Sequence, residues 1–384
     1  MRLTPPSSAL YQGETGPPDD HDGAEHHLEE EDGLKAIVYH EYGGPEVLRY
    51  TEVPTPKLGP GEALVKVQAV SLNAFDLMAR EGRYRPNPGF PHILGSDFSG
   101  EVVEIDGEAG VAFKVGQRVT AWWIVPCWRC EQCLGGHPNR CALDYKYLGA
   151  HLPGAYAQYV KLPAANLIPL PEALSWETAA AFPTAFGTAW HMLVSVAGLK
   201  PGERVLIHAA SSGVSTAAIQ IAKLVGAYVY VTSSSDAKLE RARALGADEG
   251  INYTTQDFQQ EIMRRTGKRG VDVVCEHVGG EVWGKSVRSL TRGGRLVTTG
   301  GTAAYDVSMN IAYVFQKELK LLGANSTTKG ELDIQMPLLE SGKLRPVVDR
   351  VFPLEEAAEA HRYMATRQHF GKVVLRVSHC IRGG

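Results

Sequence analysis

Short apolar runs separated by glycine and proline occupy the chain from Leu34 to about Ala165. Five of these runs are predicted strands, at residues 35–39, 63–67, 100–105, 117–121 and 156–160. Strands of this length, joined by turns such as the one at 59–61, are typical of an antiparallel barrel or sandwich. The pattern therefore predicts a small β-barrel domain.

Beyond Ala165 apolar strands alternate with helical segments. Strands are predicted at 204–208, 228–232, 271–278, 295–299 and 319–323, with helices at 214–225 and 236–245. Such alternation forms a doubly wound parallel sheet, the Rossmann α/β architecture. Residues 331–377 add two helices, at 331–341 and 354–365, and two strands, at 347–351 and 372–376. The pattern leaves open whether this last part extends the sheet or returns to the barrel.

Composition narrows the possible functions. The 384 residues are 44% apolar with a net charge of -4, so no overall basic field would attract nucleic acid. Residues 1–33 carry nine acidic residues against one basic residue, which predicts a disordered acidic extension. The sequence has no apolar run long enough to span a membrane, so we expect no membrane partner and a cytoplasmic location.

Four of the six cysteines lie within fifteen positions, in the spacing C-x2-C-x2-C-x7-C. Four thiolates complete the tetrahedral coordination of Zn²⁺ and leave no open position for substrate. We therefore predict one structural zinc ion per chain, in a reducing compartment. Its ligands would be Cys127, Cys130, Cys133 and Cys141.

A candidate phosphate-binding turn lies between the strand at 204–208 and the following helix. It contains Ser211, Ser212, Gly213 and Val214, with small residues where a dinucleotide fingerprint has its three glycines. The helix that it opens would favour phosphate through its N-terminal amides. Ser234 stands where NAD-binding chains carry an acid for the ribose, which favours NADPH. Asp236 is either a helix cap or a residue that turns toward the ribose.

The cysteine spacing, the degenerate glycine turn and the order of barrel then parallel sheet resemble the medium-chain dehydrogenase/reductase superfamily, which includes zinc alcohol dehydrogenases and quinone reductases. The resemblance runs from about Leu34 to Val377. It implies a GroES-like catalytic domain at 34–165 and 320–384, a Rossmann domain at 166–319, and a homodimer or homotetramer.

The sequence departs from the zinc alcohol dehydrogenases at the catalytic metal. The three ligand positions of that group correspond here to Asn73, Ser96 and approximately Ala180. These residues cannot hold a catalytic Zn²⁺, so its Lewis acidity is not available to a substrate alcohol. In this respect the chain looks like the zinc-free quinone and enoyl reductases.

The resemblance also assigns roles to individual residues. Asn73 and Tyr84 would border the nicotinamide and donate to a carbonyl oxygen, although Asn73 could be a turn residue and Tyr84 a surface aromatic. Lys372 would return to the cofactor. The other implied coenzyme contacts are Thr184 at the carboxamide, Ser234, Lys238 and Tyr253 at the 2'-phosphate, and His277, Val278, Gly300 and Gly301 at strand ends.

We therefore expect an NADPH-dependent reductase of an activated C=C bond, in an enone or 2-enoyl thioester, or of a quinone. An alcohol or aldehyde dehydrogenase of the same superfamily is the first alternative. A nucleotide-binding protein without catalytic activity is the second.

Overall fold

The structure is a computed structural model that describes residues 33–83, 89–107 and 113–379. The predicted disordered extension lies outside the described residues, apart from Gly33. Within the described residues no helix combines the length and apolar character that crossing a membrane requires.

The N-terminal part of the described chain forms a mainly antiparallel barrel domain. Its main sheet has the order β10-β6-β5-β3-β18-β17, with β9 also paired to β3. A smaller sheet, β2-β1-β4, is joined to the segment that precedes β9 by the bridge between Ala36 and Ala157. The strands are β1 (Leu34–Tyr39), β2 (Arg49–Val53), β3 (Glu62–Ser71), β4 (His92–Ile93), β5 (Asp97–Ile105), β6 (Arg118–Ala121), β9 (Tyr159–Pro163), β10 (Leu167–Pro169), β17 (Val348–Pro353) and β18 (Lys372–Arg376).

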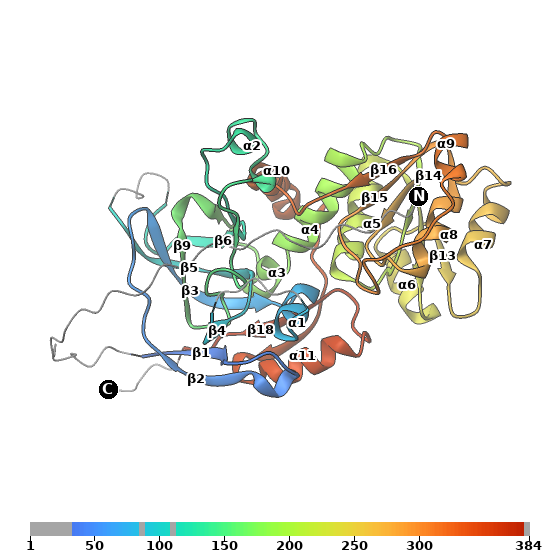
Figure 1. Cartoon of the computed structure of the whole chain (residues 1–384). Coiled ribbons are helices and arrows are strands. Elements are labelled where there is room, and N and C mark those ends of the chain that lie inside the picture. The colour runs from blue at the N-terminus through green and yellow to red at the C-terminus, as the bar shows by residue number, and fades with distance from the viewer. Residues whose placement is uncertain (1–32, 84–88, 108–112, 380–384) are drawn as a thin grey trace, which may run out of the picture. The chain divides into compact units, whose positions relative to one another are not determined.

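Burial explains why these segments form strands. In β3 the inward residues Val65, Val67 and Val70 are completely buried, and they meet Phe98 and Val102 of the paired strand β5 in one core. Branched and aromatic side chains pack well on a pleated surface, which favours strand over helix here. Figure 1 shows β18, coloured red, beside the blue strand β3, so the end of the chain completes the barrel sheet.

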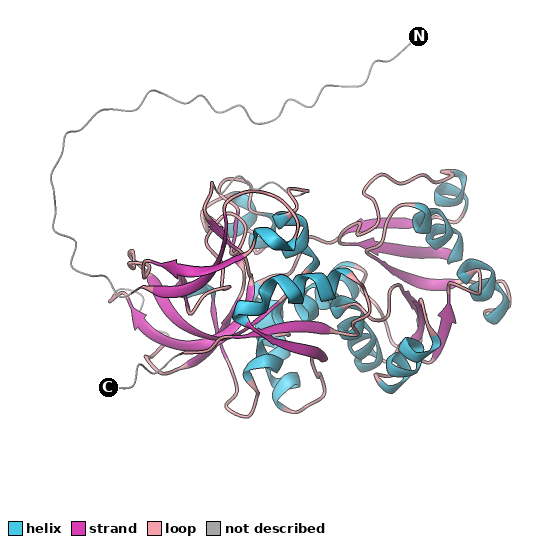
Figure 2. Ribbon diagram, turned by 90° about the horizontal axis from the view of Figure 1, so that it is seen from below, coloured by secondary structure: helices cyan, strands magenta, loops and turns pink. Residues whose placement is uncertain are grey.

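The second domain is built on a six-stranded parallel sheet with the order β13-β12-β11-β14-β15-β16. Helices cover the sheet, as Figure 2 shows. The strand order reverses between β11 and β14, the place where open parallel sheets bind ligands at their carboxyl ends. The strands are β11 (Arg204–Ile207), β12 (Tyr228–Ser233), β13 (Glu249–Asn252), β14 (Val271–Glu276), β15 (Leu290–Thr298) and β16 (Lys320–Gly323).

Helices connect these strands and join the two domains. Helix α4 (Pro183–Trp190) leads from the barrel into the sheet domain, and α10 (Lys329–Glu340) packs against it. The helices between strands are α5 (Gly213–Val225), α6 (Asp236–Ala244), α7 (Phe258–Arg265), α8 (Glu281–Ser289) and α9 (Ala312–Gln316). The sequence analysis did not predict β13, α7, α8 or α9 of this domain.

The structure corrects two of the expected domain boundaries. The expected start of the parallel-sheet domain at 166 is too early, because β10 pairs with β6 of the barrel. The expected return to the barrel at 320 is also too early, because β16 pairs with β15 in the parallel sheet. The barrel is re-entered only at β17, which pairs with β18. Hydrogen bonding to neighbouring strands, which a local pattern does not reveal, sets both boundaries.

Candidate active site and zinc loop

The four-cysteine loop, residues 127–141, has the geometry of a metal site. The four sulfur atoms all lie within 4.8 Å of one another. Three measured Sγ–Sγ separations are 3.4, 3.9 and 4.0 Å. A tetrahedral zinc ion with Zn–S bonds of about 2.3 Å would require sulfurs about 3.8 Å apart. The loop therefore fits a four-thiolate zinc ion.

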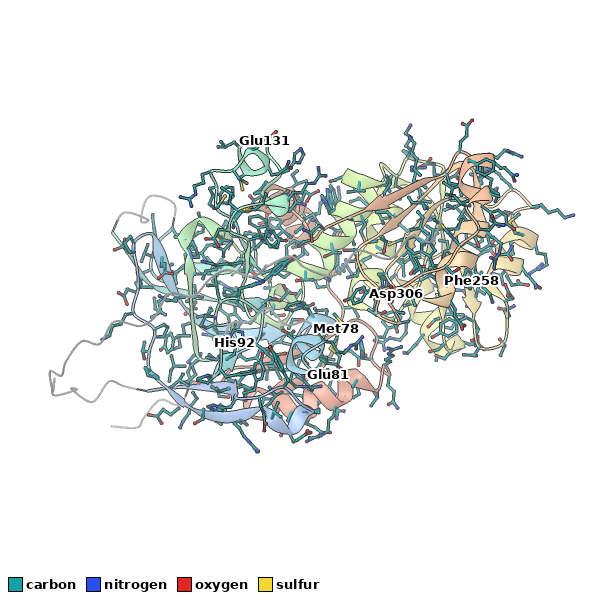
Figure 3. All side chains as sticks on the ribbon, in the orientation of Figure 1. Met78, Glu81, His92, Glu131, Phe258 and Asp306 are labelled. Carbon is teal, nitrogen blue, oxygen red and sulfur yellow. The ribbon has the colours of Figure 1, made fainter. Side chains whose placement is uncertain are left out.

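Local structure directs these thiols toward one point. Cys130 caps the short helix α2 (Glu131–Leu134), and Glu131 marks this helix in Figure 3. A hydrogen bond from the backbone N–H of Ala142 lowers the pKa of the Cys130 thiol to about 6. Burial raises the pKa of the Cys133 thiol to about 12, so this thiol needs a cation to ionise near neutral pH.

A buried polar cluster lies around Asn73, one of the positions that the resemblance matches to a ligand of the catalytic metal. It consists of Asn73, Asp76, Asp97 and Lys372, and we call it the Asn73 cluster. Asn73 caps helix α1 (Ala74–Arg80), and its backbone N–H donates to Asp76 Oδ2 at 2.7 Å. Its side-chain Nδ2 donates to Asp97 Oδ2 at 3.0 Å and to Ser96 Oγ at 3.3 Å. Both amide hydrogens of Asn73 therefore have acceptors.

Lys372 supplies the positive charge of this cluster. Its Nζ donates to Asn73 Oδ1 and lies 3.5 Å from Asp97 Oδ2. Burial lowers the pKa of the Lys372 ammonium. Burial also disfavours the charged form of Asp76 and raises the pKa of its carboxyl group to about 7, although backbone hydrogen bonds and Lys372 oppose that shift. One ammonium thus faces two buried carboxyl groups, Asp76 and Asp97.

Asp97 connects the cluster to helix α4. Its carboxylate accepts from Thr184 Oγ1 at 2.7 Å and from the Thr184 backbone N–H at 3.2 Å. The sequence analysis did not select Asp97. Its position directly after Ser96, one of the replaced ligand positions, was the available signal. The third replaced position, Ala180, lies in an apolar cluster with Ala69 and Val374 and offers no metal donor.

Lys372 also reaches the predicted phosphate turn. The structure places its aliphatic chain against Gly213, where an added Cβ would lie 2.6 Å from Lys372 Cδ. The preceding residue, Gly371, donates its N–H to Ser211 O at 2.8 Å. The start of β18 therefore brings the predicted catalytic Asn73 and the predicted phosphate turn together. Glycine at 213 is what permits this close approach.

The phosphate turn has the features of an anion-binding helix start. Ser212 caps α5 by accepting from the Ser215 backbone N–H at 3.0 Å. The side chain of Ser215 lies 2.9 Å from His277 Nε2, which joins the turn to the carboxyl end of β14. Val278 follows in the same loop, and its N–H donates to Glu276 Oε1. The unpaired amides of α5, the first of them from Gly213 and Val214, provide the partial positive charge.

The three residues expected at the 2'-phosphate lie on neighbouring segments. Ser234 is exposed just after β12, Lys238 is in α6, and Tyr253 is an exposed residue just after β13. Lys238 Nζ donates to Ser211 Oγ at 3.3 Å and to Arg367 O at 2.6 Å, two uncharged acceptors. Its positive charge is therefore not neutralised by these partners.

A cavity of about 560 Å³ opens at the carboxyl ends of β15 and β16. Gly300 lines this cavity, whereas Gly301, also predicted to contact the coenzyme, is not among the lining residues. Tyr84 lies outside the described residues, so its predicted role stays a prediction. Arg80, near Tyr84 in the sequence, is buried and donates to Gly43 O and Glu81 Oε1.

Comparisons with known proteins agree with this geometry. Residues 59–172 match the family model of the alcohol dehydrogenase GroES-like domain, and residues 245–375 match that of the zinc-binding dehydrogenase. A quinone oxidoreductase from Pseudomonas aeruginosa is 32% identical over 350 residues, 89% of this chain and 99% of the relative. An acryloyl-coenzyme A reductase from Sulfurisphaera tokodaii is 30% identical, over 89% of this chain and 100% of the relative.

A solved structure of an NAD-dependent alcohol dehydrogenase is 45% identical, with a TM-score of 0.86, and covers 90% of this chain and 100% of that chain. Fold, site and relatives define a two-domain oxidoreductase with a GroES-like barrel and a Rossmann domain. The chain belongs to the medium-chain dehydrogenase/reductase superfamily.

Proposed function

We propose that the protein is an NADPH-dependent reductase of conjugated C=C bonds, in enones or 2-enoyl thioesters, or of quinones, and that it works without a catalytic zinc ion. The observation that carries this proposal is the Asn73 cluster beside the phosphate turn. Its Asp97 carboxylate is already held by the Asn73 amide, the Thr184 hydroxyl and the Lys372 ammonium, and a fixed ammonium beside it disfavours a zinc cation, which needs thiolate, imidazole or carboxylate ligands in an open arrangement.

NADPH, when bound, supplies a hydride to the β-carbon of the acceptor, and a proton then completes the reduced product. The residues of the chain stabilise the negative charge that develops on the acceptor oxygen. Lys372 has three N–H groups, of which two face Asn73 Oδ1 and Asp97, so one remains to donate. The Ser96 hydroxyl, which accepts from Asn73, keeps its own hydrogen to donate. Asn73 thus acts as a positioning residue for both donors.

The structural zinc ion is part of this proposal. The four thiolates of residues 127–141 would hold it, with the role of fixing the loop, and the reducing cytosol suits such ligands.

An acceptor screen tests the reaction. The purified protein is expected to oxidise NADPH with an enone, a quinone or a 2-enoyl-CoA, to contain about one zinc per chain, and not to reduce ethanal. A second zinc per chain, together with alcohol oxidation, would refute the zinc-free mechanism.

The preference for NADPH has its own test. Lys238→Gln should weaken NADPH binding about 10-fold, because it removes the cation expected at the 2'-phosphate, and should change NADH binding less than twofold. The matched control is Arg243→Gln on the same helix, whose guanidinium pairs with Glu240. Equal weakening of both coenzymes by Lys238→Gln would contradict the assignment. Coenzyme fluorescence titration measures each constant.

An alcohol dehydrogenase is the second candidate, and the likeness to an NAD-dependent alcohol dehydrogenase favours it. NAD⁺-dependent oxidation of primary or secondary alcohols would support this alternative over the reductase. Coenzyme binding without turnover of any alcohol, enone or quinone would favour a non-catalytic nucleotide-binding protein.

We further propose that the protein forms a homodimer or homotetramer through the parallel sheet. β16 is an edge strand of that sheet, and the nearby Ile311 and Phe315 are 69% and 66% exposed. An unpaired edge beside exposed apolar side chains favours association with a second copy. Light scattering after gel filtration should give a mass of two or four chains, and Phe315→Glu should lower it.

A further inference from the structure

The cavity at the ends of β15 and β16 contains positive charge and donors but no acid. Arg140, from the four-cysteine loop, lines it together with Trp283 of α8 and with Tyr305. No aspartate or glutamate is among the described residues that line it. Its volume of about 560 Å³ is within the range of small-molecule sites.

Two donors at this cavity have no protein acceptor. Arg140 is exposed, and across 33–83, 89–107 and 113–379 it forms no ion pair or side-chain hydrogen bond. The indole Nε1–H of Trp283 is buried and likewise has no partner among the described residues. A buried donor without an acceptor costs free energy unless a ligand or water satisfies it.

The backbone of Arg140 is held in place from both sides. Its neighbour Asn139 is 1% exposed, and Asn139 Nδ2 donates to Asn325 O at 3.0 Å. In return Asn325 Nδ2 donates to Asn139 O at 2.9 Å. The residue on the other side, Cys141, belongs to the four-cysteine loop. This reciprocal pair, which we call the Asn139–Asn325 clamp, fixes the four-cysteine loop to the cavity wall.

Two further residues, His191 and Glu331, hold Asn139 of the clamp in place. His191 Nε2 lies 3.4 Å from Asn139 Nδ2, and His191 Nδ1 lies 2.8 Å from Glu331 Oε1. Glu331 therefore orients His191, and His191 accepts from Asn139. A chain of buried contacts thus fixes the backbone of Arg140 at the cavity wall.

No residue of the phosphate turn, 211–214, lines the cavity. The cavity is lined by residues that follow β14, β15 and β16, whereas the turn follows β11. The coenzyme phosphates are expected at the turn, so they do not account for the free cation at Arg140. Gly300, on the cavity wall, is the residue of this cavity that we expect to contact the coenzyme.

We infer that Arg140 binds an anionic group, a carboxylate or a phosphate, carried by the acceptor. This inference rests on the proposed reductase function and refines its substrate class. The planar guanidinium matches both groups because it can donate two parallel hydrogen bonds to them. Arg140 is accordingly a specificity-determining residue, and its effect falls on the acceptor and not on the coenzyme.

The test compares three acceptors in wild type and Arg140→Gln. They are cyclohex-2-enone, which is neutral, 4-oxopent-2-enoate, which carries a carboxylate, and crotonyl-CoA, which carries phosphates. We expect Arg140→Gln to lower kcat/KM about 10- to 100-fold for the anionic acceptor that fits and less than twofold for cyclohex-2-enone. The anionic acceptor that loses more identifies the source of the anion. Arg140→Lys should retain part of the preference.

Controls separate recognition from loss of the loop. Arg129→Gln is matched, because Arg129 is also exposed and adjoins a cysteine of the loop, Cys130, but does not line the cavity. It should behave as wild type, and every variant should keep its zinc and its NADPH dissociation constant. An equal loss for all three acceptors, a weaker NADPH affinity in Arg140→Gln, or no loss at all would overturn the inference.

A binding measurement keeps the inference testable if wild type reduces none of the acceptors. 4-Oxopentanoate, the saturated product of the carboxylate acceptor, and butyryl-CoA are titrated calorimetrically into the protein saturated with NADP⁺. Binding of either to wild type that weakens about 10-fold or more in Arg140→Gln supports the anion site although the proposed reaction has failed. Absence of binding, or equal binding to both proteins, refutes the anion site.

Discussion

The four-cysteine loop and the Asn73 cluster differ in how the negative charge of their buried ionisable groups is balanced. The loop gathers four thiols within 4.8 Å, and only an added cation can balance them once they ionise. The Asn73 cluster contains its own cation, Lys372, 3.5 Å from Asp97 Oδ2. The same barrel domain therefore contains one cluster that could hold a metal ion and one buried cluster that contains its own cation. The difference follows from the side chains, because thiolates bind zinc and amides do not.

The largest effect should come from removing a ligand of the loop. Cys133→Ser should lower bound zinc from about one per chain to nearly none, and should destabilise the protein by on the order of 5 kcal/mol, because metal binding free energy is folding free energy. Elemental analysis and chemical denaturation measure the two effects. The control is Cys275→Ser, a buried thiol of β14 outside the loop, which should keep its zinc. Retained zinc in Cys133→Ser would show that the loop does not need all four thiols.

The next effect should come from removing the internal cation. Lys372→Met keeps much of the side-chain volume but leaves Asp97 and Asp76 without their ammonium partner. Breaking one side of a buried pair typically costs about 3–5 kcal/mol. Reductase activity should fall by at least 100-fold while zinc content stays unchanged. An active Lys372→Met variant would mean that the Asn73 cluster is structural only.

The pH dependence of stability provides a sharper test of the Asn73 cluster. Burial raises the pKa of Asp76 from its ordinary 3.8 to about 7. A carboxyl with a raised native pKa stabilises the fold fully below its unfolded pKa, and this contribution is lost as pH rises to about 7. Wild type should therefore lose stability relative to Asp76→Asn between pH 4 and 7, by up to about 1.4 kcal/mol per pH unit. Parallel stability curves for the two proteins would contradict the raised pKa.

The smallest effect should come from the contact between Lys372 and the phosphate turn. Gly213→Ala would place a Cβ 2.6 Å from Lys372 Cδ, so the lysine must shift. We expect coenzyme affinity to fall about 10-fold, the equivalent of roughly 1.4 kcal/mol, with little change in zinc content. Gly330→Ala, near the start of α10 with open space around it, is the matched control. Unchanged affinity in Gly213→Ala would separate the turn from the cluster.

The sequence by itself determined the sites whose residues are close together in the chain. The cysteine spacing predicted a cluster of four thiols, which the structure contains, and the strand and helix predicted on either side of the turn are β11 and α5. Phosphate binding at that turn stays a prediction. Periodicity predicted most strands because one-sided burial imposes it. It missed β13, α7, α8 and α9, and Tyr84 remains a prediction from resemblance alone.

Only the tertiary structure decided how distant residues meet. Lys372 was expected at the coenzyme, but the structure also joins it to Asn73, 299 positions earlier in the chain. It showed that Asp97 accepts from Thr184, and that Asn139 is clamped to Asn325 across 186 positions. These contacts depend on which strands pair and on which carboxylates are buried away from solvent. Both are set by the tertiary structure, so a local sequence pattern does not reveal them.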